Sequence, residues 1–183
     1  MGPEHQEKMV GGSLGRAAAY MLSLTGPVAP REEVERRMLD GMVERLSESA
    51  PLMPGAKELL GEVRAAGIPI ALVSSSHRVL IEAVLDGVGR EYFDVTVAGD
   101  EVARHKPDPE PYLTAAARLA ADPRRCVALE DSPTGVAAAE AAGCVTVAVP
   151  GVVPVPAAPG RTVVESLRDL DLAVLRSLVA GVP

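Results

Sequence analysis

Apolar residues recur along this chain with two different spacings, and the change of spacing predicts a layered α/β fold. From about Leu14 to Ser47 the spacing is that of amphipathic helices, and glycine and prolines at 26–30 divide the stretch into a helix pair. After residues 51–55 a unit of one helix and one short apolar strand repeats. This repetition is typical of a parallel sheet covered by helices rather than of a helical bundle.

The repeated unit occurs four times. Helices are predicted at 56–66, 78–88, 110–121 and 133–142, and strands at 68–74, 95–98, 126–130 and 145–149. A loop rich in proline and glycine is predicted at 150–160, and a closing helix at 166–178. We therefore divide the chain into a helical part, residues 1–50, and an α/β core, residues 51–183.

Composition and charge exclude several classes of partner. The net charge is -7 and the basic residues are scattered, so we expect no nucleic-acid partner. The apolar runs are far too short to span a membrane, and residues 1–10 lack the apolar segment of a secretory signal, so we expect a cytoplasmic protein. Cys126 and Cys144 each lie in a strand-like apolar run and are predicted to be inert core thiols.

Polar residues follow three of the predicted strands, where ligands of open α/β sheets bind. Ser74, Ser75 and Ser76 end the first strand and open a helix, so hydroxyls and free backbone N–H groups meet the positive end of a helix dipole. This pattern predicts a phosphate-binding cradle. A plain serine helix cap explains it equally well when this stretch is taken by itself.

The other two strand ends carry charged residues. Pro107 restricts the backbone of Lys106 to an extended conformation, which would fix an ammonium group beside a phosphoryl group. Glu130 and Asp131 end the third strand, and paired carboxylates are natural ligands for Mg²⁺. An exposed loop lysine and an acidic helix cap are the ordinary alternatives, but all three features in this order favour a phosphate and metal site.

These stretches resemble the haloacid dehalogenase superfamily, in the subgroup with a helical cap. The matching segments are Leu52–Ala56 (LMPGA), Ile70–Ser76 (IALVSSS), Ala98–Pro111 (AGDEVARHKPDPEP) and Ala128–Gly143 (ALEDSPTGVAAAEAAG). The resemblance implies a Rossmann-like parallel sheet with helices on both faces and a partial cap in residues 1–50. It also implies that Ser74 binds the transferring phosphoryl group, that Lys106 neutralises charge, and that Asp131 holds Mg²⁺ with Glu130 beside it.

One motif of that superfamily has no counterpart. DxDGT, which carries the nucleophilic aspartate at the end of the first, central strand, does not occur in the sequence. We expect the lack of this strand to leave two inner strand edges unpaired. We therefore expect a fragment, a mis-started reading frame or part of a longer chain, which does not turn over by itself.

The resemblance leaves several functions open. The leading hypothesis is a Mg²⁺-dependent phosphatase that acts on a small phosphorylated metabolite through a phosphoaspartate in the complete protein. A phosphomutase like beta-phosphoglucomutase has an arginine soon after a GxS element; here Leu14 follows residues 11–13, although Arg16 could compensate. The acidic pair argues against a metal-free dehalogenase, and a non-catalytic phosphate-binding scaffold is a further alternative. His77 is a candidate substrate contact, and the sequence does not indicate the oligomeric state.

Overall fold

A computed structural model describes residues 5, 14–26, 28–149 and 151–181 of the chain. Its α-helices are α2 (Leu14–Thr25), α3 (Arg31–Glu48), α4 (Ala56–Ala65), α5 (Arg78–Val88), α6 (Glu110–Arg118), α7 (Pro133–Ala141) and α8 (Leu172–Ala180). The strands are β1 (Ala71–Val73), β2 (Val95–Val97), β3 (Val127–Glu130), β4 (Val145–Ala148) and β5 (Arg161–Val163). The α/β class and the alternation of helix and strand are as predicted. Among the described residues, no helix is long and apolar enough to cross a membrane.

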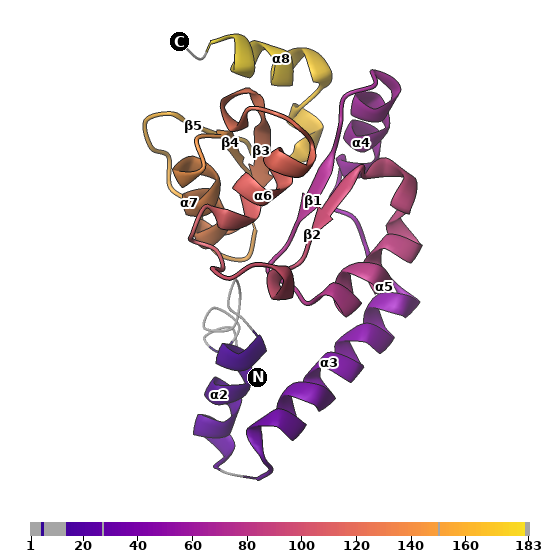
Figure 1. Cartoon of the computed structure of the whole chain (residues 1–183), viewed down its shortest axis with the longest axis vertical. Helices are drawn as coiled ribbons and strands as arrows, with labels where there is room; N and C mark the ends of the chain where they lie inside the picture. The colour runs from indigo at the N-terminus through magenta and orange to yellow at the C-terminus, as the bar shows by residue number, and fades with distance from the viewer. Residues whose placement is uncertain (1–4, 6–13, 27, 150, 182–183) are drawn as a thin grey trace.

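The strands form two separate parallel sheets (Figure 1). In one sheet β1 pairs with β2, with Leu72 opposite Thr96. In the other, β4 lies between β3 and β5, with Leu129 opposite Val147. Within the described residues, β1 has no strand partner besides β2, and β3 has none besides β4. The unpaired edges expected from the lack of a central strand are therefore present.

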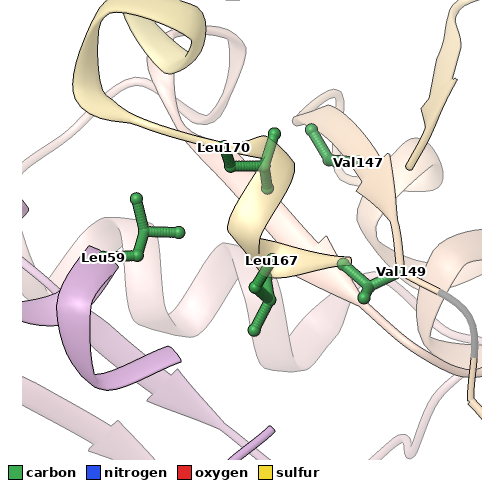
Figure 2. Packing of buried hydrophobic residues seen from close by; sticks show 5 residues of the cluster. All are labelled: Leu59, Val147, Val149, Leu167 and Leu170. Carbon is green, nitrogen blue, oxygen red and sulfur yellow. The ribbon is translucent and has the colours of Figure 1, made fainter. Parts of the chain in front are cut away.

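Each sheet is stabilised by its own apolar cluster. Leu59 of α4, Val147 and Val149 pack with Leu167 and Leu170, which precede the last helix (Figure 2). Val174, Leu175 and Leu178 of α8 extend this cluster. A second cluster joins Ile81 and Leu85 of α5 to Ala98 and to Leu72 of β1. Helices from distant parts of the sequence thus bury the strands by removing apolar surface from water.

The N-terminal helices form an antiparallel pair that projects from the α/β body (Figure 1). α2 packs against α3, and α3 packs against α5. The break between them lies where glycine and proline were expected to end the first helix, and Gly26 has a positive φ of 77°. A domain boundary at residue 50 stays a prediction.

The C-terminal part differs from the prediction in two ways. The predicted helix 166–178 is interrupted: a short 3-10 turn at Leu167–Asp169 precedes α8. The Asp171 side chain accepts a hydrogen bond from Val174 N, so α8 has its own capped start. The strand β5 lies directly after the predicted loop and was not expected, because a three-residue strand has too few positions to show a period.

The cysteines were also placed wrongly. Cys126 and Cys144 are half-buried free thiols rather than core residues, and both line a cavity between the sheets. Burial raises the pKa of Cys126, and it raises the pKa of Cys144 to about 11. Both thiols therefore remain protonated, and hence unreactive, at neutral pH.

Candidate functional site

The serine segment continues directly from β1. Ser74 N donates to Val97 O at 3.0 Å, which extends the pairing with β2 by one residue. The Ser74 hydroxyl then accepts a hydrogen bond from Ser76 N at 3.1 Å. This bond closes a tight turn between the strand and α5. Within the described residues Ser75 N donates no hydrogen bond, so one backbone donor of the predicted cradle is available.

The helix behind this turn begins at the predicted residue, Arg78, but it has no serine cap. His77, not a serine, occupies the N-cap position of α5, and its side chain makes no capping hydrogen bond. Asp100 accepts a hydrogen bond from Arg78 N at 2.9 Å and lies 3.6 Å from His77 Nδ1. The Asp100 carboxylate therefore already compensates the positive end of the α5 dipole. Binding of substrate by His77 stays a prediction.

Lys106 joins the ends of β1 and β3. Its ammonium group donates to Val73 O at 3.1 Å and to Tyr112 Oη at 3.2 Å, and it forms an ion pair with Glu130 Oε1. These three contacts use all three N–H donors of the ammonium. Val73 directly precedes Ser74 in the sequence. Lys106 therefore lies beside the serine segment that follows β1 and beside Glu130 at the end of β3.

Glu130 is the buried centre of this cluster. The Lys106 and Glu130 side chains are each only 7% exposed. Tyr112 donates its hydroxyl to Glu130 Oε1, and Ser132 Oγ donates to Glu130 Oε2 at 3.3 Å. Burial, and secondarily the Glu130 charge, raise the pKa of Tyr112 far above its ordinary value, so its phenol stays a hydrogen-bond donor.

Helix α7 packs onto the same carboxylate. A Cβ atom at Gly135 would overlap the Glu130 carboxyl group, so only glycine fits at this position. Ser132 caps α7 by accepting from Gly135 N at 3.1 Å. The start of α7 is thereby fixed against β3, and the Glu130 side chain is held toward Lys106.

Asp131 is the acidic residue that remains available. It is exposed, and within the described residues its carboxylate forms no hydrogen bond or ion pair. A Cβ at Gly151 would lie 2.6 Å from Asp131 O, so the chain after β4 passes close by. No group of three or more His, Cys, Asp or Glu side chains in the described part of the chain forms a complete metal site. One free carboxylate nevertheless suits Mg²⁺, which commonly takes one or two carboxylates and completes its shell with water and phosphate oxygens.

The structure thus brings Ser74, Lys106 and Glu130 together, with Asp131 adjacent in sequence. Arg16 lies on α2, and its contribution to the site stays a prediction. The GxS element at 11–13 lies outside the described residues. Tyr112 and Gly135 were missed. Tyr112 could have been noticed because it lies six positions after Lys106 and the chain has only three tyrosines. Gly135 could not, because nothing in the neighbouring sequence distinguishes it from other helix glycines.

Comparison with known proteins identifies the family of the chain. The family model for haloacid dehalogenase-like hydrolases matches residues 12–143. Hexitol phosphatase B of Escherichia coli strain K12 is 36% identical over 121 residues, which cover 66% of this chain and 54% of that protein. The bifunctional riboflavin kinase/FMN phosphatase of Arabidopsis thaliana is 44% identical over 101 residues, 54% of this chain and 26% of that protein.

The fold agrees with solved structures as well. The crystal structure of CbbY from Rhodobacter sphaeroides in complex with phosphate superposes with a TM-score of 0.84 at 30% identity. The superposition covers 94% of this chain and 82% of the CbbY chain. The matched segments span about half of hexitol phosphatase B and about a quarter of the Arabidopsis protein, at 54% and 26% of their lengths.

Proposed function

Because the chain belongs to the haloacid dehalogenase-like hydrolase family, we propose that it forms the phosphate-binding part of a phosphatase for small phosphorylated sugars or polyols. The observation that carries this proposal is the meeting of two strand ends at Lys106, which contacts both Val73 O and Glu130. The names of the relatives support the substrate class, since one is a hexitol phosphatase. A phosphorylated metabolite also suits a chain without basic stripes or predicted membrane spans.

In this proposal the residues of the chain position and neutralise the phosphoryl group. Ser74 Oγ and Ser75 N–H donate hydrogen bonds to its oxygens, which stabilises the charge that develops during transfer. Lys106 supplies a fixed positive charge next to them. Glu130 and Tyr112 hold the ammonium in place. For Lys106 to bind a phosphate oxygen directly, it exchanges one of its three present acceptors.

A magnesium ion is part of the same proposal. Asp131 would hold Mg²⁺, while Glu130 stays paired with Lys106. When bound, the metal ion would polarise phosphate oxygens and favour attack at phosphorus. The available Asp131 carboxylate supports this assignment.

The nucleophile is not among the residues of this cluster. No DxDGT motif occurs in the 183 residues, so we propose that the attacking carboxylate belongs to the complete protein and lies outside these residues, which alone do not turn over. Attack forms a phosphoaspartate and releases the alcohol, and water then hydrolyses this intermediate to regenerate the carboxylate and release phosphate.

The test uses residues 1–183 and a version extended at the N-terminus by an apolar strand ending in DxDGT and a linker. Phosphate release from hexitol phosphates and from p-nitrophenyl phosphate is measured with and without Mg²⁺. The proposal predicts turnover only in the extended protein supplied with Mg²⁺. Equal turnover by residues 1–183 alone, or turnover unaffected by chelation of Mg²⁺, would contradict it.

A further inference from the structure

Cys126 and Cys144 are the two cysteines of the chain, and the fold places them opposite each other on neighbouring strands. β3 and β4 pair in parallel, with Val127 opposite Val145. Val145 N donates to Cys126 O at 2.9 Å, and Cys126 has the extended backbone of a strand residue, with φ -102° and ψ 135°. The pairing therefore continues toward the amino ends of the strands, where Cys126 and Cys144 are the next opposed residues.

The two thiols lie on the same face of this sheet. Side chains alternate between the faces along each strand, so opposed residues of a parallel pair share a face. Figure 1 shows β3 and β4 side by side. The electrostatics agree with this placement: burial and, secondarily, the Cys126 thiol raise the pKa of Cys144 to about 11. Both side chains are half-buried, so a small ion can reach them from solvent.

The spacing of the strands suits a bridged pair of sulfur atoms better than a direct bond between them. Neighbouring strands lie about 4.7–4.9 Å apart. A disulfide requires Cβ atoms about 3.5–4.5 Å apart, so its formation would draw the strands together. Two metal–thiolate bonds of about 2.3 Å each, the length known for zinc, span about 4.6 Å when they are in line. Such a bridge fits the strand spacing without a shift of the backbone.

The number of available ligands favours an ion of low coordination number. Structural zinc takes four ligands. Within the part of the chain that the structure describes, no group of three or more His, Cys, Asp or Glu side chains could hold a metal ion. The carboxylate of Asp122, which precedes β3, accepts from Arg124 at 2.8 Å, and the Asp122 backbone oxygen accepts from Cys126 Sγ at 3.3 Å. Two sulfur ligands without a third group suit Cu⁺, an ion that soft thiolate ligands select.

We propose that Cys126 and Cys144 form a binding site for one soft monovalent cation, Cu⁺, held between their sulfur atoms at the amino ends of β3 and β4. Binding forms two sulfur–copper bonds and breaks two S–H bonds, and both protons pass to solvent without a change of oxidation state. Glu130 lies at the other end of β3, so the site is separate from the proposed phosphate site. Copper binding is measured without substrate, and its outcome is therefore independent of the phosphatase proposal.

The experiment titrates residues 1–183, reduced and kept free of oxygen, with Cu⁺ supplied from a competing chelator of known affinity. Native mass spectrometry gives the number of ions per chain, and the ultraviolet thiolate-to-copper absorption reports sulfur ligands. One ion per chain and the release of about two protons per ion are expected, because both thiols are protonated before they bind. The ion is also expected to raise the urea concentration at the midpoint of unfolding, since it binds the folded chain preferentially.

Variants of the chain provide the matched controls. Cys126→Ser and Cys144→Ser each leave one sulfur atom, and each is expected to weaken binding by at least about 10²-fold, the upper range for loss of a group that only supports a metal ligand. Met42→Leu removes a thioether on α3 that is 41% exposed, and it is expected to leave the affinity unchanged. Cys126→Ala and Cys144→Ala repeat the test if either serine alters the circular dichroism of the chain.

Four results would overturn the proposal. Binding that survives both cysteine substitutions would place the ion on other groups, and loss in only one variant would mean a site with a single thiol. Two chains per ion would mean that copper bridges separate molecules. Equal affinity of the native and the urea-unfolded chain would mean that strand pairing does not build the site.

Discussion

Lys106 and Glu130 form an ion pair in which both side chains are almost wholly buried. Such a pair is expensive to desolvate, and removal of one member leaves an uncompensated charge. Tyr112 reduces this cost by donating its hydroxyl to Glu130 while accepting from Lys106. At the scale of single residues, this cluster is where charge, burial and the proposed chemistry coincide.

Replacing Tyr112 by phenylalanine tests the hydroxyl directly. Tyr112→Phe removes one donor from a buried carboxylate, and we expect the free energy of unfolding to fall by about 1–3 kcal/mol. Urea denaturation measures the change. Tyr92→Phe is the matched control, since the Tyr92 hydroxyl has no hydrogen bond within the described residues, and it should change stability by less than about 0.5 kcal/mol. Equal effects of the two substitutions would refute the role of the Tyr112 hydroxyl.

Glu101 provides a prediction about pH. Hydrogen bonds from the Arg78 side chain, and secondarily from Ala98 N, lower the pKa of Glu101 from 4.5 to about 2. A lowered carboxyl pKa stabilises the fold above pH 4.5, and this stabilisation is lost as the pH falls toward about 2. Glu101→Gln should therefore reduce stability at neutral pH, by about 1 kcal/mol or less because the pair is partly exposed.

The pH dependence separates this effect from a general defect. Urea denaturation at several pH values should show the difference between Glu101→Gln and the parent shrinking as the medium becomes more acidic. Glu62→Gln changes an exposed helix carboxylate that has no ion pair within the described residues, and its effect should be small at every pH. A Glu101→Gln difference that stays constant with pH would contradict the shifted pKa.

The positions of the candidate site residues could be predicted from the sequence, but the contacts between them could not. Ser74, Lys106, Glu130 and Asp131 could be singled out because strand ends are recognisable from apolar runs and turn residues. The pairing of Glu130 with Lys106 could not be predicted. It depends on Tyr112, whose position across the cluster is set by tertiary packing and leaves no periodic signal in the sequence.

At the scale of helices and strands, the start of α7 fixes the carboxylate of Glu130. Ser132 accepts from Gly135 N, and Gly135 lies so close to Glu130 that a side chain has no room. The beginning of a helix and the end of a strand are thus adjusted to each other. Sequence predicted the helix start from serine followed by proline, but not the close approach.

Two glycine substitutions separate helix propensity from this close approach. Gly135→Ala should destabilise the protein by about 1–3 kcal/mol, as overpacking does, because the new methyl group displaces the Glu130 carboxylate or α7. Gly61→Ala on α4 has nothing within 4 Å of its Cβ and should stabilise by about 0.5–1 kcal/mol. Thermal or urea denaturation of both variants tests the pair. Stabilisation by both would mean that Gly135 is not constrained by Glu130.

Helices and strands were predicted correctly where the regular spacing of apolar residues continued over many positions, and they were missed where an element was too short to show such spacing. The eight predicted helices and strands of the four repeated units are all present, with ends displaced by up to three residues. The strand β5 and the break before α8 were missed, because a three-residue strand and one capping aspartate carry little pattern. Local hydrogen bonds at such short elements outweigh the apolar spacing.

At the scale of the whole molecule, the division of the strands into two parallel sheets is the main feature. The sequence predicted unpaired inner edges from the absence of DxDGT, and β1 and β3 have such edges within the described residues. It could not predict that helices α4, α6 and α8 would enclose the space as one cavity. The enclosure of this space depends on tertiary packing, because a different apolar cluster packs on each of the two sheets.

The central claim is that Ser74, Lys106 and Asp131 serve one phosphate-transfer site, and kinetics of the DxDGT-extended protein test it most directly. We predict that Ser74→Ala and Asp131→Asn each lower kcat/KM for a hexitol phosphate by about 10²-fold or more, the scale of losing a transition-state contact. Ser177→Ala and Asp86→Asn, on the exposed parts of α8 and α5, should change it little. Losses of equal size in all four variants, or none in the first two despite unchanged folding, would contradict the account.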